Sequence, residues 1–293
     1  MARSIATAAL VSMRPLHWIK NVFVLAPLVF AQRLTDGDAA LRAMAAFGLF
    51  CLVSSAIYLV NDLADRSLDR LHRRKRNRPI AAGELSPTVA TVLAVLLAMA
   101  GLVAGLALGT GVAAILAGYL VLNLGYSLGL KNVVILDVML VAAGFLLRAW
   151  GGAVAVAVDM SNWLILCTGL IALFLGFVKR RQELDGLADL EPAQRPILAE
   201  YSVGFLDQMI GVVTASTVLS YAFYVFSPEV AQKLDTPYMG LTLPFVLYGI
   251  FRYLYLVHRR GEGESPTGLV VQDGPLRTVI LLWGVVVLVL LFA

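Results

Sequence analysis

The sequence is poor in charged residues. Only 14% of its 293 residues are Asp, Glu, Lys or Arg, whereas 60% are hydrophobic and the mean hydropathy is +0.84. A soluble domain of this size typically carries about 25% charged residues. We therefore expect residues 1–293 to form a single membrane domain with no separate soluble module.

Cysteine and histidine are also scarce. Cys51 and Cys167 are the only two cysteines, and both stand in apolar runs far apart in the sequence. The three histidines, His17, His72 and His258, have no spacing typical of metal ligands. These numbers exclude a disulfide framework and argue against a zinc site.

Long apolar runs recur along the whole chain. Runs of about 20 residues have the length that a membrane-spanning helix needs. They are continuous rather than alternating, which indicates helices and not the strands of a barrel. The sequence predicts an all-α, polytopic membrane protein of about nine transmembrane helices. The predicted spans are residues 18–33, 41–61, 89–108, 112–130, 133–156, 163–178, 203–226, 238–257 and 278–292.

The connections between these spans predict the orientation. Basic residues collect in the connections around residues 62–86, 131, 179–181 and 259–260, which lie on one side if there are nine spans. The other side has only Arg33, Arg42 and Lys233. The positive-inside rule places the basic side and the N-terminus in the cytoplasm. We expect a multi-pass protein of the cell membrane, in contact with membrane lipids, whose active-site loops are cytoplasmic.

An acidic motif stands at the end of the second predicted span. Asn61, Asp65 and Asp69 follow each other at intervals of four residues, which puts them on one face of a helix, and Asp62 lies on the adjacent stripe. Clustered carboxylates repel one another unless a cation lies among them. Hard oxygen ligands suit Mg²⁺, which takes its remaining ligands from water and substrate phosphate. The motif predicts that all four residues bind Mg²⁺ and that the three aspartates are catalytic. A solvated acidic turn among basic residues is the alternative.

Two further groups of polar residues follow on the same side. Most of the basic run at residues 73–78 is explained by topology and anionic lipid, but Arg78 opens a loop that leads back to the membrane. Lys179, Arg180 and Glu183 follow the sixth predicted span. They form either a second half-site, with an acid for a second magnesium ion and cations for phosphate, or a topology signal at a helix end.

Single polar residues near the other spans leave alternatives open. Tyr126 and Lys131 close the fourth span, and Lys131 serves either as a point charge for phosphate or as an interfacial anchor. Arg148 lies inside the fifth span, where arginine is costly and normally faces a polar interior. It is either a substrate contact or a structural residue bound to backbone or to Asp137. For Asp207 and Arg252 we favour pairing between helices.

These residues resemble a known family. Residues 61–69 match N-D-x-x-D-x-x-x-D, the first aspartate-rich motif of the UbiA intramembrane prenyltransferase superfamily, and Arg78-Pro79 and Tyr126-Ser127 follow in that family's order. The chain is similar above all to one subgroup, the decaprenyl-phosphate phosphoribosyltransferases. The similar stretches are residues 14–21, 144–149, 179–183, 248–253 and 273–276.

The resemblance implies a helical bundle around a central cavity with cytoplasmic cap loops. It also implies an Mg²⁺-dependent transfer of phosphoribose from 5-phosphoribosyl 1-diphosphate to a polyprenyl (decaprenyl) phosphate, with release of diphosphate. In a mycobacterium or a relative, the product would serve synthesis of cell-wall arabinan in arabinogalactan. The implied substrate-binding residues are Lys20, Asn61, Arg78, Tyr126, Lys131, Arg148, Lys179, Arg180 and Glu183.

The second motif departs from the superfamily pattern. Lys179 and Arg180 precede Glu183 where D-x-x-x-D is usual, while Asp185 and Asp189 keep that spacing further on. Which of these acids binds a second metal ion therefore stays open. If Lys179 and Arg180 bind phosphate, replacing either should slow transfer and change stability little.

Other functions are weighed against this one. A UbiA-type enzyme that moves a prenyl group from a prenyl diphosphate to an aromatic or lipid acceptor is the main alternative. A transporter is disfavoured because its polar sites usually lie at mid-membrane, whereas the acidic motifs here lie at one face. We expect no nucleic-acid partner, and a homo-oligomer is left open.

Overall fold

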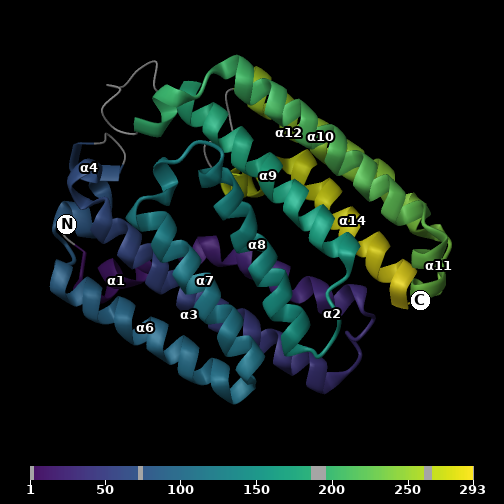
Figure 1. Cartoon of the computed structure of the whole chain (residues 1–293), viewed down its shortest axis with the longest axis horizontal. Helices are drawn as coiled ribbons and strands as arrows, with labels where there is room; N and C mark the ends of the chain where they lie inside the picture. Colours follow the sequence, from purple (N-terminus) through teal and green to yellow (C-terminus); the bar gives the residue numbers. More distant parts are fainter. Residues whose placement is uncertain (1–2, 72–74, 186–195, 261–265, 293) are drawn as a thin grey trace.

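The computed structural model describes residues 3–71, 75–185, 196–260 and 266–292, and these residues form helices and no strands (Figure 1). Among the described residues, eight helices are long and apolar enough to cross a membrane. They are α3 (Gly37–Ala64), α6 (Pro87–Leu108), α7 (Thr110–Leu128), α8 (Leu136–Ala155), α9 (Asn162–Asp185), α10 (Val203–Phe226), α12 (Leu243–Arg260) and α14 (Gly274–Phe292). The prediction of an all-α polytopic membrane protein is confirmed.

Shorter elements join the long helices or cover their ends. The short α-helices are α1 (Ile5–Met13), α2 (Ala26–Phe30), α4 (Arg66–Leu71), α5 (Pro79–Ala82), α11 (Pro228–Leu234) and α13 (Pro266–Gln272). The 3-10 helices are η1 (Pro15–Leu25), η2 (Lys75–Asn77), η3 (Leu130–Asn132), η6 (Pro196–Glu200) and η7 (Tyr238–Thr242).

The first predicted span, residues 18–33, is wrong as one regular helix. The structure has η1 and then α2, and Pro27 near the start of α2 lacks the N–H that a continuous helix would use. A 3-10 helix rises about 2.0 Å per residue, so η1 covers about 22 Å and α2 adds about 7 Å, close to the roughly 30 Å of a bilayer core. Arg14 before η1 contacts Asp62 where α3 ends, and Gln32 after α2 donates to the Leu291 carbonyl where α14 ends. This segment therefore crosses the whole bundle beside the eight regular spans.

The crossing segment rests closely on α8. A side chain at Gly152 would place its Cβ 1.9 Å from the carbonyl oxygen of Val24, so only glycine lets the two backbones meet. At Gly151 the same position is filled by the ring of Phe50 from α3. The two glycines let α8 approach η1 at Gly152 and α3 at Gly151.

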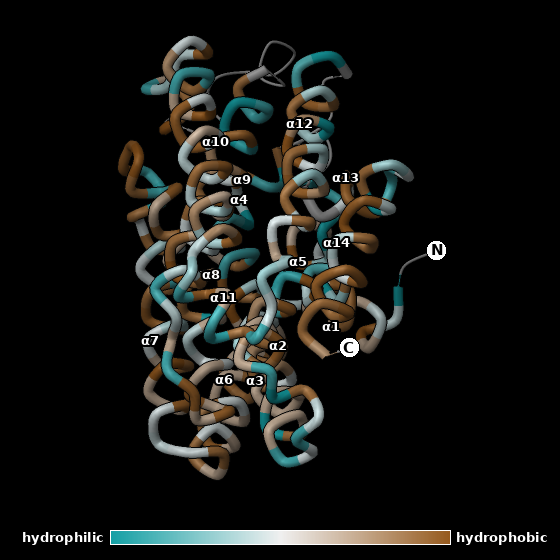
Figure 2. The backbone as a smooth tube through the Cα atoms, turned by 90° about the vertical axis from the view of Figure 1, so that its right-hand side faces the viewer, coloured by the Kyte–Doolittle hydropathy of each residue, from teal (hydrophilic) through white to brown (hydrophobic). Residues whose placement is uncertain are grey.

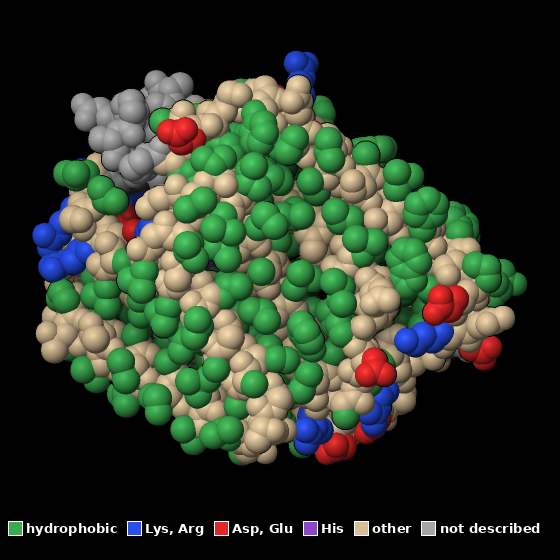
Figure 3. All heavy atoms as spheres, in the orientation of Figure 1, with side chains coloured by type: hydrophobic (Ala, Val, Ile, Leu, Met, Phe, Trp, Pro, Cys, Tyr) green, Lys and Arg blue, Asp and Glu red, His purple; other side chains and the backbone are tan. Residues whose placement is uncertain are grey.

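The long helices surround a central space. α3 packs on α6, α7 and α8, while α9 packs on α8 and α10, and α12 packs on α14 (Figure 1). One apolar cluster joins α9, α10 and α12, and a second joins α3, α7 and η1. In Figure 2 the hydrophilic segments gather at helix ends and connections, and Figure 3 shows charged side chains along the rim of a largely apolar face. This distribution suits a bundle immersed in lipid.

Polar residues concentrate where α3, α7 and α9 end and α8 begins. We call this the polar end of the bundle, defined by Asp62, Tyr126, Asp137 and Arg180. Backbone hydrogen bonds from Asp65 to Asn61 and from Asp69 to Asp65 carry the helical path from α3 into α4. The helical path that the prediction assumed is therefore present from Asn61 to Asp69, but only Asn61 and Asp65 of these three residues line the cavity.

Candidate active site

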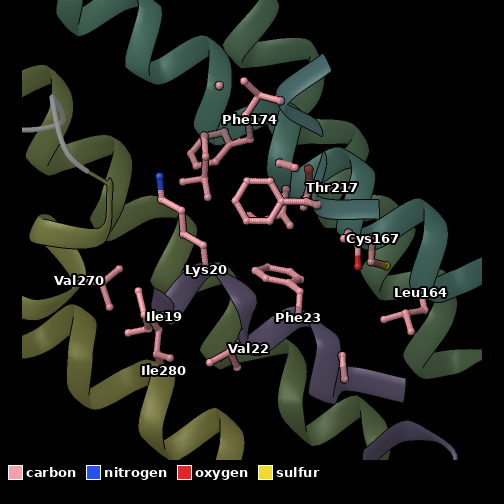
Figure 4. Close-up of a pocket in the computed structure, with 18 of the residues that line it drawn as sticks. Ile19, Lys20, Val22, Phe23, Leu164, Cys167, Phe174, Thr217, Val270 and Ile280 are labelled. Carbon is pink, nitrogen blue, oxygen red and sulfur yellow. The ribbon is translucent and has the colours of Figure 1, made fainter. Parts of the chain in front are cut away.

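A cavity of about 2000 Å³ runs through the bundle from the polar end. α9 contributes Lys179 at the polar end and Trp163 near its other end, and these positions are about 24 Å apart at a rise of about 1.5 Å per residue. Acids and cations line the polar end, while the deeper part is mostly apolar (Figure 4). The cavity thus offers space for a polar group at one end and a long apolar group behind it.

Asp62 and Asp69 share one arginine. Asp62 is only 2% exposed and accepts hydrogen bonds from Arg14 (2.5 Å) and Arg78 (3.1 Å). Asp69 is also buried and accepts from Arg78 at 2.6 Å. Asp62 and Arg78 line the cavity, whereas Asp69 is not among its lining residues. Asp69 therefore contacts Arg78, a cavity-lining residue, and does not itself line the cavity.

Asp65 is paired with a lysine from another helix connection. The Lys131 ammonium in η3 lies 2.5 Å from one carboxylate oxygen of Asp65, and the amide of Asn61 donates to the other at 3.2 Å. Ser127 at the end of α7 donates to the Asn61 side-chain oxygen at 3.4 Å. All four residues line the cavity. The acidic motif and Lys131, predicted separately, are thus one cluster.

Arg180 is the centre of a second, more buried cluster. Arg180 is 3% exposed and lies 2.5 Å from the carboxylate of Asp137, which is fully buried. It also contacts Glu183, and it donates to the Tyr126 hydroxyl at 3.0 Å. Tyr201 donates to the other oxygen of Asp137 at 2.7 Å. Burial raises the pKa of Tyr201 to about 12, and the bond to Asp137 acts in the same direction, so this hydroxyl stays protonated. Because Arg180 is buried and ion-paired, we now expect that replacing it destabilises the protein, in contrast to the small change predicted from the sequence.

Lys179 and Lys20 present their ammonium groups differently. Lys179 is 43% exposed and lies 3.8 Å from Glu183 one turn further along α9, as the i, i+4 spacing predicts. Lys20 lies in the middle of η1, and Figure 4 shows it extending into the cavity beside Phe23. Both lysines line the cavity, as expected of substrate-binding residues.

Arg148 is placed away from the cavity lining. It is buried among η1, α7 and α8, where it donates to Asn21 at 2.8 Å and to the Tyr119 hydroxyl at 2.5 Å. Its guanidinium also stacks over the rings of Tyr119 and Phe145. Asp137, considered as its partner, is bound to Arg180 instead. In this structure Arg148 joins three elements of the wall and does not reach substrate space.

The two remaining charged residues of the spans pair between helices, as favoured from the sequence. Arg181 of α9 contacts Asp207 of α10 at 3.0 Å, and Arg252 of α12 contacts Asp273 before α14 at 2.8 Å. Asp189 lies outside the described residues, as does part of the basic run that precedes Arg78.

The acidic motif has ligands that fit magnesium, although its acids are engaged with cations here. No three His, Cys, Asp or Glu side chains gather as a metal cluster within the described part of the chain. Instead, Asp62 contacts Arg14 and Arg78, and Asp65 contacts Lys131. Carboxylates and an amide oxygen on the cavity wall are the hard donors that Mg²⁺ prefers. Exchange of these ion pairs for a metal ion would free the cations for phosphate.

Sequence reasoning missed the partners that come from distant elements. Arg14, Asp137 and Tyr201 complete the two clusters, yet each stands in a different segment from its partner. The sequence does mark two of these residues as candidates for ion pairing. Arg14 and Asp137 each stand at the start of an apolar segment that has few other charged residues. Tyr201 had no such signal.

Comparisons with known proteins agree with this architecture. The sequence model of the UbiA prenyltransferase family matches residues 21–269. The decaprenyl-phosphate phosphoribosyltransferase of Corynebacterium glutamicum is 34% identical over 291 residues, covering 96% of this chain and 86% of that protein. The same enzyme of Mycolicibacterium smegmatis is 34% identical over 293 residues, covering 96% of this chain and 91% of that protein.

Solved structures show the same fold. A UbiA homolog from Archaeoglobus fulgidus bound to GPP and Mg²⁺ superimposes with a TM-score of 0.74 at 16% identity, covering 96% of this chain and 99% of that one. The chain is therefore a multi-pass membrane transferase that belongs to the UbiA prenyltransferase family.

Proposed function

We propose that this protein transfers phosphoribose from 5-phosphoribosyl 1-diphosphate to a polyprenyl phosphate and releases diphosphate. The observation that carries the proposal is the pair of charged clusters at the mouth of one apolar cavity, one around Asp65 and one around Arg180. Two anionic substrates need cations on more than one wall of the mouth, and Arg78, Lys131 and Lys179 all line it, while the Arg180 cluster joins α9 to α8. The nearly full-length similarity to decaprenyl-phosphate phosphoribosyltransferases supports the same reaction.

The acidic motif is the site for the donor diphosphate. Magnesium bound by Asn61, Asp62 and Asp65 would neutralise the diphosphate and make it a better leaving group. Arg78 and Lys131 already lie against these carboxylates, at 3.1 Å from Asp62 and 2.5 Å from Asp65. They are placed to contact the phosphate oxygens, and charge-assisted contacts of this kind are the strong ones. Asp69, which does not line the cavity, accepts a hydrogen bond from the guanidinium of Arg78.

The acceptor needs no general base. A phosphate monoester is already an anion at neutral pH, since its second pKa is about 6. Its oxygen forms a bond to C1 of the ribose while the bond from C1 to the diphosphate oxygen breaks, and the electron pair leaves with diphosphate. The chain's task is to hold the two anions in line and to keep water away, which the apolar cavity and the buried Arg180 cluster serve.

The orientation follows the same logic. A free sugar diphosphate is water-soluble, so the polar end must face the compartment that supplies it. The basic connections assign that end to the cytoplasm of a cell membrane by the positive-inside rule. The polyprenyl tail remains in lipid and in the apolar part of the cavity. In a mycobacterium or a relative, the product would be a precursor of cell-wall arabinan.

One alternative has support of its own. The A. fulgidus homologs are bound to GPP or DMAPP together with Mg²⁺, so a prenyl diphosphate donor suits the fold. In that reaction the prenyl group would leave its own diphosphate and move to an aromatic or lipid acceptor. The two reactions differ in which substrate loses diphosphate.

The deciding experiment uses the purified protein in detergent. It is incubated with Mg²⁺, a polyprenyl phosphate and 5-phosphoribosyl 1-diphosphate labelled in the ribose, and the organic phase is counted. Label in the organic phase that depends on both substrates is the expected result. No label there, together with release of diphosphate from a prenyl diphosphate, would replace the proposal by the alternative.

A further inference from the structure

We propose that Lys20 and Lys179 together bind the phosphate of the lipid acceptor, and that this monophosphate binds without the metal ion. The inference rests on the proposed function for the identity of the acceptor. It assigns the two anions to different halves of the polar end: the donor to the acidic motif, and the acceptor to a pair of lysines from η1 and α9.

Lys20 is a cation without a counter-charge. Among the described residues it forms no ion pair and donates no hydrogen bond, although its side chain is half-buried in the cavity wall. Figure 4 shows its ammonium extending from η1 with Phe23 beside it and Phe174 on the facing wall. By contrast, Lys131 and Arg180 each contact a carboxylate. A partly desolvated ammonium among apolar side chains is costly unless an anion joins it.

Lys179 supplies the second charge from the facing wall. It lies on α9 and lines the same cavity as Lys20. Its ammonium lies 3.8 Å from Glu183, which Arg180 also contacts. Two like charges that face one cavity are relieved by an anion between them. Lysine ammonium groups act as compact point charges, which suits a single phosphate.

The position of Lys20 selects a lipid phosphate over the phosphate of a free sugar. Lys20 stands where the polar end meets the apolar part of the cavity, with Ile19, Val22 and Phe23 around it (Figure 4). A phosphate at this depth is followed by apolar walls down to Trp163, where only a hydrocarbon tail is well solvated. A sugar phosphate would leave that space unfilled. The acceptor therefore places its head on the lysines and its tail along the cavity.

Binding without turnover tests the inference. Purified protein in detergent is titrated with farnesyl phosphate in the presence of EDTA, and affinity is measured by calorimetry. The wild type should bind, and Lys20→Met and Lys179→Met should each weaken binding roughly ten- to a hundred-fold, as expected for loss of a charge-assisted contact. Methionine keeps the apolar stem of lysine. Lys233→Met is the matched control, because Lys233 lines the far end of the same cavity, and its affinity should not change.

Two additional probes sharpen the result. Farnesol, which lacks the phosphate, should bind the wild type and Lys20→Met equally. Lys20→Arg, which keeps the charge, should retain affinity for farnesyl phosphate within a few-fold, and this separates loss of charge from loss of folding. Farnesyl phosphate that binds only with Mg²⁺, or that binds Lys20→Met as tightly as wild type, would overturn the inference.

Steady-state kinetics separates this inference from the proposed function. With each substrate varied in turn, Lys20→Met should raise the KM of the polyprenyl phosphate and leave that of 5-phosphoribosyl 1-diphosphate unchanged. The reverse pattern would assign Lys20 to the phosphate of the sugar and refute the inference. A wild type that binds farnesyl phosphate through Lys20 but transfers no phosphoribose would refute the proposed function and leave the phosphate subsite standing.

Discussion

Arg180 and Lys179 are neighbours in sequence, but the structure predicts opposite consequences for their removal. Arg180 is 3% exposed and holds the fully buried Asp137 at 2.5 Å, together with Glu183 and Tyr126. Removing one partner of a buried pair leaves the other charge uncompensated and typically costs about 3–5 kcal/mol. Lys179 is 43% exposed and lies 3.8 Å from Glu183, and an exposed pair of this kind contributes about 0–1 kcal/mol. Arg180→Met should therefore destabilise the protein by several kcal/mol, whereas Lys179→Met should be nearly neutral.

The assay is chemical unfolding of both variants in mixed detergent micelles, followed by circular dichroism. A third variant, Arg180→Met with Asp137→Asn, removes the stranded charge but keeps an acceptor for the Tyr201 hydroxyl. If the loss comes from the uncompensated carboxylate, the double variant should be more stable than Arg180→Met alone, with a coupling of about 0.5–3 kcal/mol. Equal unfolding free energies for Arg180→Met and Lys179→Met, within about 1 kcal/mol, would refute the structural role of Arg180.

Three further predictions address the metal site and the packing of η1. Asp65→Ala should abolish turnover while the protein stays folded in detergent, since Asp65 lines the cavity and is paired with Lys131. Activity within a few-fold of wild type would contradict the assignment of Asp65 to the metal site. Chelation with EDTA should stop the reaction and Mg²⁺ should restore it, so full activity in metal-stripped enzyme with excess EDTA would rule the mechanism out. Gly152→Ala should destabilise the protein by about 1–3 kcal/mol or more, because the added Cβ would lie 1.9 Å from the Val24 carbonyl oxygen. Gly48→Ala is the control and should not destabilise it, since a Cβ at Gly48 would have no atom within 4 Å. The two variants are compared by the midpoints of their unfolding curves.

Local spacing predicted the parts of the site that lie on one helix. The i, i+4 relation placed Asn61 beside Asp65 and Lys179 beside Glu183, and both pairs are present at 3.2 and 3.8 Å. Spacing of this kind depends only on helix geometry. Pairs between segments, such as Arg14 with Asp62, depend on which helix faces which, and periodicity along one helix carries no such information.

The first predicted span shows the same limit for the fold. Its apolar composition correctly indicated a segment at membrane depth, but length was counted with the rise of an α-helix. The segment from Pro15 to Phe30 is instead mostly 3-10 helix, which covers more distance per residue. Pro27 interrupts a continuous helix from within the segment, and Gly152 on α8 permits the close approach of the η1 backbone. The apolar pattern alone carries no information on that contact with α8.

The ion pairs of the polar end also explain how charged groups are kept at membrane depth without substrate. Asp62, Asp65 and Asp69 are matched by Arg14, Arg78 and Lys131, so the acidic motif is electrically balanced in the structure. A magnesium diphosphate would exchange these internal pairs for contacts of Asp62 and Asp65 with the metal and of Arg78 and Lys131 with phosphate, which would leave these charges compensated.

Lys20 stands outside this balance, and that difference gives the two halves of the site different requirements. The donor half must break ion pairs before it binds, and it needs the metal ion to do so. In the acceptor half, the Lys20 ammonium has no ion-pair partner among the described residues and would gain one from the lipid phosphate. The lipid therefore has an electrostatic reason to bind first.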